Sequence, residues 1–194
     1  FGLLNVINFA HGALFMLGAM VTWMAMNYFE INYWVMLIAA PFMVGLFGVF
    51  IERFLLRWIY KLDHLYGLLL TLGLSLLIEG VFRSVYGVSG LGYDTPEALT
   101  GATDLGFMML PNYRAWVVVA SLVVCVATWY VIEKTRIGAY LRAGTENPRL
   151  VEAFGVNVPV MITLTYAFGV GLAAFAGVLA APASDRTAHR RLAA

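Results

Sequence analysis

The sequence is poor in charged residues. Only 12% of its 194 residues are Asp, Glu, Lys or Arg, whereas soluble domains average about 25%. Hydrophobic residues make up 62% of the chain, which leaves too little polar surface to cover a water-soluble fold. Together these two figures exclude an ordinary soluble domain and predict a membrane protein. The net charge of +1 adds little, because the distribution of charge matters more than its sum in a membrane protein.

Cysteine and catalytic motifs are also scarce. The single cysteine, Cys125, lies in an apolar run and excludes an intrachain disulfide. There is no Cys/His cluster, and the G-x-S-x-G, H-E-x-x-H and Walker A patterns are missing. We therefore expect no catalytic residue, metal or cofactor in this chain, and any ATP-Mg would be held by partner subunits. We also expect no nucleic-acid partner.

Long apolar runs are what the sequence has in abundance. A helix of about 20 mostly apolar residues crosses a bilayer. Five runs reach such a length and predict an all-α, polytopic transmembrane bundle over residues 1–182. The five predicted spans are Phe9–Met26 (beginning at Leu3 at the earliest), Trp34–Ile51, Leu65–Val81, Ala115–Ile132 and Pro159–Ala181.

Two of the connecting loops are basic. Residues 52–64 hold Arg53, Arg57 and Lys61, and residues 133–157 hold four further Lys and Arg residues. Because Lys and Arg mark cytoplasmic loops, both loops are expected in the cytoplasm. They are separated by two spans, so the two assignments agree. The loop 83–114 is then extracytoplasmic, and its many Gly, Pro and Asn residues predict irregular backbone with one short helix near Pro96–Leu99.

Polar residues recur every four positions in the third span, at Thr71, Ser75, Glu79 and Arg83. This spacing keeps them on one side of a helix. An ionisable residue within a span is costly and usually faces a path or the bundle interior. Glu79 therefore either lines a translocation path or simply pairs with Arg83. Thr71 and Ser75 either join it or bond only to carbonyls of their own helix.

The first span begins with a second polar face. Asn5, Asn8 and His11 are three residues apart and share one side of a helix. These residues either form hydrogen bonds between helices or lie on a path through the bundle. The predicted path residues are thus Asn8, His11, Thr71, Ser75 and Glu79.

Small residues are spaced four apart in the fifth span, at Gly169, Ala173 and Gly177. Such a row lets another helix approach closely, so it predicts a helix-packing surface.

The basic stretch 134–158 is the longest charged run between two spans. Pro148 suits the first turn of a helix and Gly155 suits its end. The pair predicts a short helix over Pro148–Phe154, with Thr145 or Asn147 as its N-cap. We interpret the stretch as a coupling loop that a cytoplasmic partner grips through a set of polar and glycine residues: Arg142, Gly144, Glu146, Arg149, Glu152 and Gly155.

Four stretches carry a resemblance to a known family. Residues 2–19 (GLLNVINFAHGALFMLGA), with the core Asn8-Phe9-Ala10-His11-Gly12, resemble a segment near the start of permeases in branched-chain amino-acid ABC importers. Residues 71–80, 135–158 and 167–182 are similar to the same family. The resemblance extends to about Pro182.

This resemblance implies an importer subunit in the bacterial inner membrane. Such a permease pairs with a second, related permease, two cytoplasmic ATPase subunits and a periplasmic solute-binding protein. The coupling helix of importers carries Glu-Ala-Ala followed by Gly. This chain matches that pattern in part, at Glu146, Glu152, Ala153 and Gly155. The residues leave open a urea or short-amide permease of the same superfamily, a secondary transporter, and a non-functional truncated permease.

Both ends of the chain depart from the family pattern. Members have a further apolar span before the segment that matches Gly2 and more spans after Pro182. Residues 183–194 (ASDRTAHRRLAA) bring three arginines to the side predicted to be extracytoplasmic. We therefore expect an incomplete transmembrane domain over residues 1–182. For the tail, either the predicted topology is wrong by one span, or residues 183–194 are not its native continuation.

Overall fold

The computed structural model describes residues 8–59, 62, 64–87, 96–104 and 109–192. Within this part, five helices are long and apolar enough to cross a membrane: α1 (Ala10–Phe29), α2 (Tyr33–Ile51), α4 (His64–Tyr86), α5 (Asn112–Lys134) and α8 (Val158–Leu192). α2 continues through a π-helix, η1 (Glu52–Leu56), into the short α3 (Arg57–Ile59). The predicted all-α bundle of about five spans is confirmed, although the proposed start at Leu3 lies outside the described residues.

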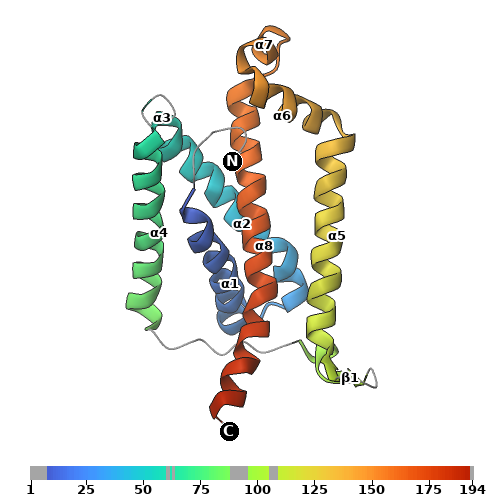
Figure 1. Cartoon of the computed structure of the whole chain (residues 1–194). Helices are drawn as coiled ribbons and strands as arrows, with labels where there is room; N and C mark the ends of the chain where they lie inside the picture. The colour runs from blue at the N-terminus through green and yellow to red at the C-terminus, as the bar shows by residue number, and fades with distance from the viewer. Residues whose placement is uncertain (1–7, 60–61, 63, 88–95, 105–108, 193–194) are drawn as a thin grey trace.

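Helix α8 lies at the centre of the bundle (Figure 1). It packs against both α1 and α2, and α4 packs against α1. The apolar core between these helices is formed by aliphatic side chains and alanines: Ala10, Leu14, Val44, Ile51, Leu56, Val170 and Ala174. Only 17% of the α4 span and 6% of the α5 span are buried. Both outer helices therefore present apolar surface that suits lipid.

Small residues let α8 approach its two neighbours. A Cβ added at Gly177 would overlap the backbone carbonyl of Phe15 in α1, and one added at Gly18 would overlap the backbone of Ala174. On the other side, a Cβ at Gly171 would lie 3.2 Å from the Pro41 carbonyl oxygen of α2. Since lipid is as apolar as leucine, such close packing is a main source of helix association in a membrane.

The two basic loops lie at one end of the bundle, here called the basic end (Figure 1). It carries α3 together with two further helices, α6 (Arg136–Glu146) and α7 (Pro148–Ala153). The opposite end, here called the strand end, carries β1 (Ala102–Asp104) and β2 (Met109–Pro111). The span count correctly predicted that the basic loops share one side.

The strand end is more ordered than the sequence indicated. The short helix expected near Pro96–Leu99 is present as η2, a 3₁₀-helix over Glu97–Leu99. The antiparallel pair of β1 and β2 was not predicted, because strands of three residues are too short to show alternation. Beside it, the Tyr113 hydroxyl donates to the Leu179 carbonyl and lies 3.0 Å from the Tyr33 hydroxyl. These bonds join α2, α5 and α8.

Helix α8 is longer than the predicted fifth span. The span was expected to end at Ala181, but the helix continues through Pro182 to Leu192. Proline inside a helix removes one backbone donor, and the residues that follow include good helix formers such as Ala, Arg and Leu. The helical course of residues 183–192 leaves the nature of this tail a prediction.

Gly177 offers a direct test of the close packing. We expect Gly177→Ala to lower the thermal unfolding temperature of the detergent-purified protein, because overpacking a fixed backbone contact costs about 1–3 kcal/mol. Gly73→Ala on α4 is the matched control, since an added Cβ there meets no atom within 4 Å. It should leave stability unchanged or raise it, as Ala is favoured over Gly in helices by about 1 kcal/mol. Equal unfolding temperatures for the two variants would contradict the proposed contact.

Candidate functional site

Two short helices cap the basic end, where a single one was expected. The prediction of a helix over Pro148–Phe154 is correct to within one residue, since α7 spans Pro148–Ala153. The second helix, α6, was missed because Gly138 and Gly144 are poor helix formers within an eleven-residue segment. The sequence had instead indicated that Gly138 and Gly144 lie in the coupling loop, outside its one predicted helix.

The caps of α7 follow the sequence closely. The Asn147 side chain accepts a hydrogen bond from the Leu150 backbone amide at 3.2 Å, which confirms Asn147 as the N-cap. The alternative, Thr145, instead donates to the Arg142 carbonyl at 2.6 Å. Gly155 has a φ of 82°, a left-handed conformation that glycine adopts without strain and that ends the helix.

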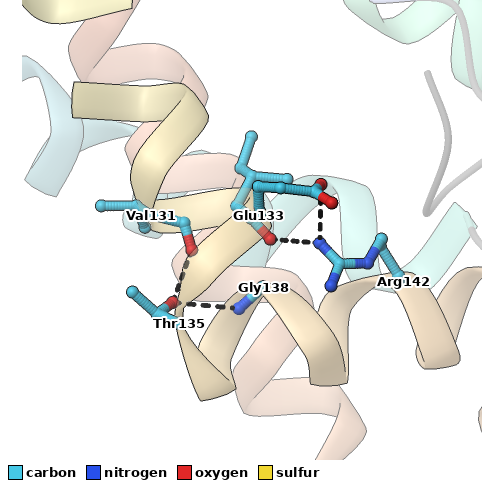
Figure 2. A network of polar contacts seen from close by, with 6 residues as sticks. Val131, Glu133, Thr135, Gly138 and Arg142 are labelled. Atoms are coloured by element: carbon cyan, nitrogen blue, oxygen red, sulfur yellow. Dashed lines mark hydrogen bonds and ion pairs between the residues drawn. The ribbon is translucent and has the colours of Figure 1, made fainter. Parts of the chain in front are cut away.

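The corner between α5 and α6 is held by several polar contacts (Figure 2). The Thr135 hydroxyl donates to the Val131 carbonyl at 2.5 Å and accepts from the Gly138 amide at 3.3 Å. Arg142 donates to the Ile132 carbonyl and to the Glu133 carboxylate, the latter at 3.3 Å. A Cβ on Gly138 would overlap the Ile132 carbonyl. The direction of α6 relative to α5 is therefore fixed.

Helix α7 presents a mixed surface to solvent. Arg149 and Glu152 are exposed. Leu150 and Phe154, four residues apart, are 55% and 79% exposed, so they form an apolar pair beside these charges. Val151 faces the other way and packs against Val158 and Met161, which anchors α7 to the start of α8. Sequence analysis singled out the charged residues but missed Leu150 and Phe154.

The remaining residues of the predicted coupling set lie on or beside these helices. Glu146 is the exposed last residue of α6, and Gly144 is buried on the same helix. The structure thus gathers the set on one protruding pair of helices (Figure 1). Its contact with a partner remains a prediction.

The predicted path residues lie on α1 and α4 but do not form one cluster. Thr71 is buried and accepts from the Phe9 amide at 3.2 Å, while its hydroxyl donates to the Gly67 carbonyl at 2.9 Å. Glu79 pairs with Arg83 at 3.8 Å and is 41% exposed. This ion pair is one of the two arrangements that the sequence left open.

The other three predicted path residues are Asn8, His11 and Ser75. Asn8 donates from its side-chain amide to the Tyr166 hydroxyl at 3.2 Å, which is the interhelical bond that one interpretation of this face expected. His11 is exposed, and its Cε1 would lie 4.0 Å from a Cβ added at Gly169. Ser75 is half-buried. Of the predicted packing row, Gly177 is buried against α1 and Ala173 is half-buried.

The sequence did not indicate that the carboxyl group of Glu52 is buried. Glu52, at the start of η1, is 2% exposed, and the Thr163 hydroxyl of α8 donates to its Oε2 atom at 2.6 Å. The basic residues that follow had placed Glu52 in a cytoplasmic loop. The apolar residues at Ile51, Leu55 and Trp58 could have indicated that the helix continues past it.

Within the described residues, no group of three His, Cys, Asp or Glu side chains could hold a metal ion. The five candidate spans, together with the exposed helices α6 and α7 at the basic end, define a multi-pass membrane protein. The profile of the family described as the branched-chain amino acid transport system permease component matches residues 1–188. The chain belongs to this family.

Curated relatives match at low identity. The high-affinity branched-chain amino acid transport system permease protein LivH is 27% identical over 194 residues in Escherichia coli K12 and 25% identical over 190 residues in Salmonella typhimurium. The permease protein BraD of Pseudomonas aeruginosa is 24% identical over 197 residues. Each match covers 92% of this chain and 62% of the relative, so the chain spans less than two thirds of their length. No solved structure gives a significant match.

The α5–α6 corner can be tested by adding one methyl group. Gly138→Ala should force the corner open, because its Cβ would meet the Ile132 carbonyl. We expect trypsin to cut the variant several-fold faster after Arg136, Arg142 and Arg149. Ala139→Leu adds more volume at the exposed neighbouring position and should be cut at the rate of the unaltered chain. If both variants are cut at that rate, the corner is not held by this contact.

Proposed function

We propose that the chain is a membrane-spanning permease subunit of an ATP-binding-cassette importer that carries branched-chain amino acids into the cytoplasm. The match to the family profile over residues 1–188 is the observation that carries this proposal. The names of the relatives all specify branched-chain amino acids, which favours these solutes over urea or short amides. The protein would reside in the bacterial inner membrane, with its basic end in the cytoplasm.

The proposed partners are a second, homologous permease subunit, two cytoplasmic ATPase subunits and a periplasmic solute-binding protein. ATP-Mg would be bound and hydrolysed by the ATPases, so this chain would not itself be an enzyme. Helix α7 would enter a groove on an ATPase. Its exposed Leu150 and Phe154 would fill apolar pockets there, and Arg149 and Glu152 would pair with charges at the rim.

Translocation would follow alternating access, in which helices rock between states open to one side or the other. We propose that Asn8, His11, Thr71, Ser75 and Glu79 lie along the path. An apolar path with few polar groups suits leucine, isoleucine and valine, whose side chains need no hydrogen bonds. Glu79 would attract the ammonium group, and Asn8 or Ser75 would bind the carboxylate.

Uptake by the assembled transporter in proteoliposomes tests both the solute and the energy source. We expect uptake of labelled leucine that requires ATP, is inhibited by isoleucine and valine, and is unaffected by excess urea. Inhibition by urea would indicate the short-amide alternative, and uptake without ATP would indicate a secondary transporter.

The same assay separates the two roles of Glu79. Glu79→Gln removes the carboxylate, whereas Arg83→Gln breaks the same ion pair but keeps the carboxylate. A path role requires leucine uptake to fall about tenfold more with Glu79→Gln than with Arg83→Gln. A tenfold difference corresponds to about 1.4 kcal/mol of transition-state stabilisation by the carboxylate. Equal effects would reduce Glu79 to a partner of Arg83.

Docking of α7 on an ATPase can be tested through its apolar pair. The double variant Leu150→Ser and Phe154→Ser should lower the amount of ATPase subunit that copurifies with the permease at least tenfold, since buried apolar side chains carry much of the energy of an interface. Phe29→Ser on α1 is the control, because Phe29 is 74% exposed but lies at the strand end. Copurification that is unchanged in the double variant would rule out α7 as the docking element.

A further inference from the structure

One group of polar contacts between the spans lies near the basic end. Thr71 lies seven residues into α4, and Thr163 and Tyr166 lie five and eight residues into α8, which is between about one and a half and two turns. Asn8 lies two residues before α1, and Glu52 lies seven residues before the end of α3. The segments α2–α3, α4 and α8 meet the basic loops on the same side of the bundle (Figure 1).

Within this group, the bond between Glu52 and Thr163 stands out. It joins the segment α2–η1 to α8 over a separation of 111 residues, with 2.6 Å between Thr163 Oγ1 and Glu52 Oε2. Glu52 is buried beside Ile51 and Leu56 of the apolar core. Among the described residues, Glu52 forms no ion pair with Lys or Arg within 4.0 Å. A buried carboxyl without a counter-ion is costly and needs its hydrogen-bond donor.

The backbone around Glu52 is also unusual. Residues 52–56 form a π-helix inside an otherwise continuous α-helical segment. Single π-turns are rare and occur frequently at functional sites, because the extra residue changes the direction of the side chains that follow. Here the π-turn begins at the residue that bonds to α8.

Thr163 lies next to the part of α8 that packs against α7. Val151 of α7 packs on Val158 and Met161, and Met161 lies only two residues before Thr163 on α8. A displacement of α7 would therefore act on the first turns of α8 through these contacts. Thr163 is the position in those turns that hydrogen bonds to the segment α2–η1.

The Thr163 hydroxyl has a second acceptor within reach. The carbonyl of Pro159 on its own helix lies 3.0 Å from Thr163 Oγ1. Because the Thr163 hydroxyl has one hydrogen to donate, rotation about its Cβ–Oγ1 bond can redirect that hydrogen from the Glu52 carboxyl to the Pro159 carbonyl. Thr163 thus keeps a partner when α8 moves away, and only the contact between the helices is lost.

We propose that the Glu52–Thr163 bond is a releasable link that passes motion of α7 to α2, so that both residues position helices for transport without touching the solute. This inference rests on the proposed coupling of α7 to an ATPase. With the bond formed, α2 and α8 are held together at the cytoplasmic side. When an ATPase displaces α7, the bond breaks and these two helices separate.

A comparison of stability with coupling tests the link in the assembled transporter. Thr163→Val has nearly the same shape but leaves the carboxyl of Glu52 without its donor. It should lower the unfolding temperature and raise the number of ATP molecules hydrolysed per leucine imported at least threefold. Thr163→Ser retains the hydroxyl and should restore the unaltered ratio. The double variant Thr163→Val with Glu52→Leu replaces both polar partners by apolar ones, which is often neutral for stability.

The double variant separates a structural role from a positioning role. The link requires that its unfolding temperature recover while the ATP-to-leucine ratio stays raised. If the ratio recovers together with the unfolding temperature, the bond is structural only. An unaltered ratio in Thr163→Val would also overturn the link. If the unaltered transporter imports leucine without consuming ATP, the proposed function fails. This outcome is distinguishable from failure of the link, because it is measured on the unaltered transporter alone.

Discussion

Close approach of helix backbones is the constraint on which the structure depends. At Gly18, Gly171 and Gly177 there is no room for a full side chain between α8 and its neighbours. Burial from water cannot drive spans together inside a membrane, so van der Waals contact over these small residues is what holds α1, α2 and α8 together. The central position of α8 follows from having such residues on two of its faces.

Polar contacts are distributed differently from this packing. The bonds that involve Asn8, Thr71 and Glu52 lie towards the basic end, and the bonds of Tyr113 lie at the strand end. The close packing joins helix backbones through many atoms at once. A hydrogen bond of a single side chain contributes about 1 kcal/mol net, and more where it satisfies a buried carboxyl such as that of Glu52.

Much of the fold could be predicted from the sequence, because the length of an apolar run is enough to identify a span. The cap at Asn147 and the stop at Gly155 could also be predicted, since both depend on local backbone chemistry. What could not be predicted depends on distant partners. Glu52 looks like a loop residue until Thr163, far along the chain, is placed beside it. The exposure of Leu150 and Phe154 likewise follows from which face of α7 Val151 anchors.

Helix α5 is attached at its two ends and scarcely between them. At the strand end Tyr113 bonds to α8, at the basic end the corner of Thr135, Gly138 and Arg142 fixes α6, and only 6% of the span is buried. The distance between these attachments is set by the length of α5, a candidate span that packs on little of the described chain. Bilayer thickness influences the tilt of such a helix at a cost of fractions of a kcal/mol per Å, so a change in thickness would act on the position of α6 and α7 relative to the core. The lipid composition of the membrane is in this sense part of the geometry of the basic end.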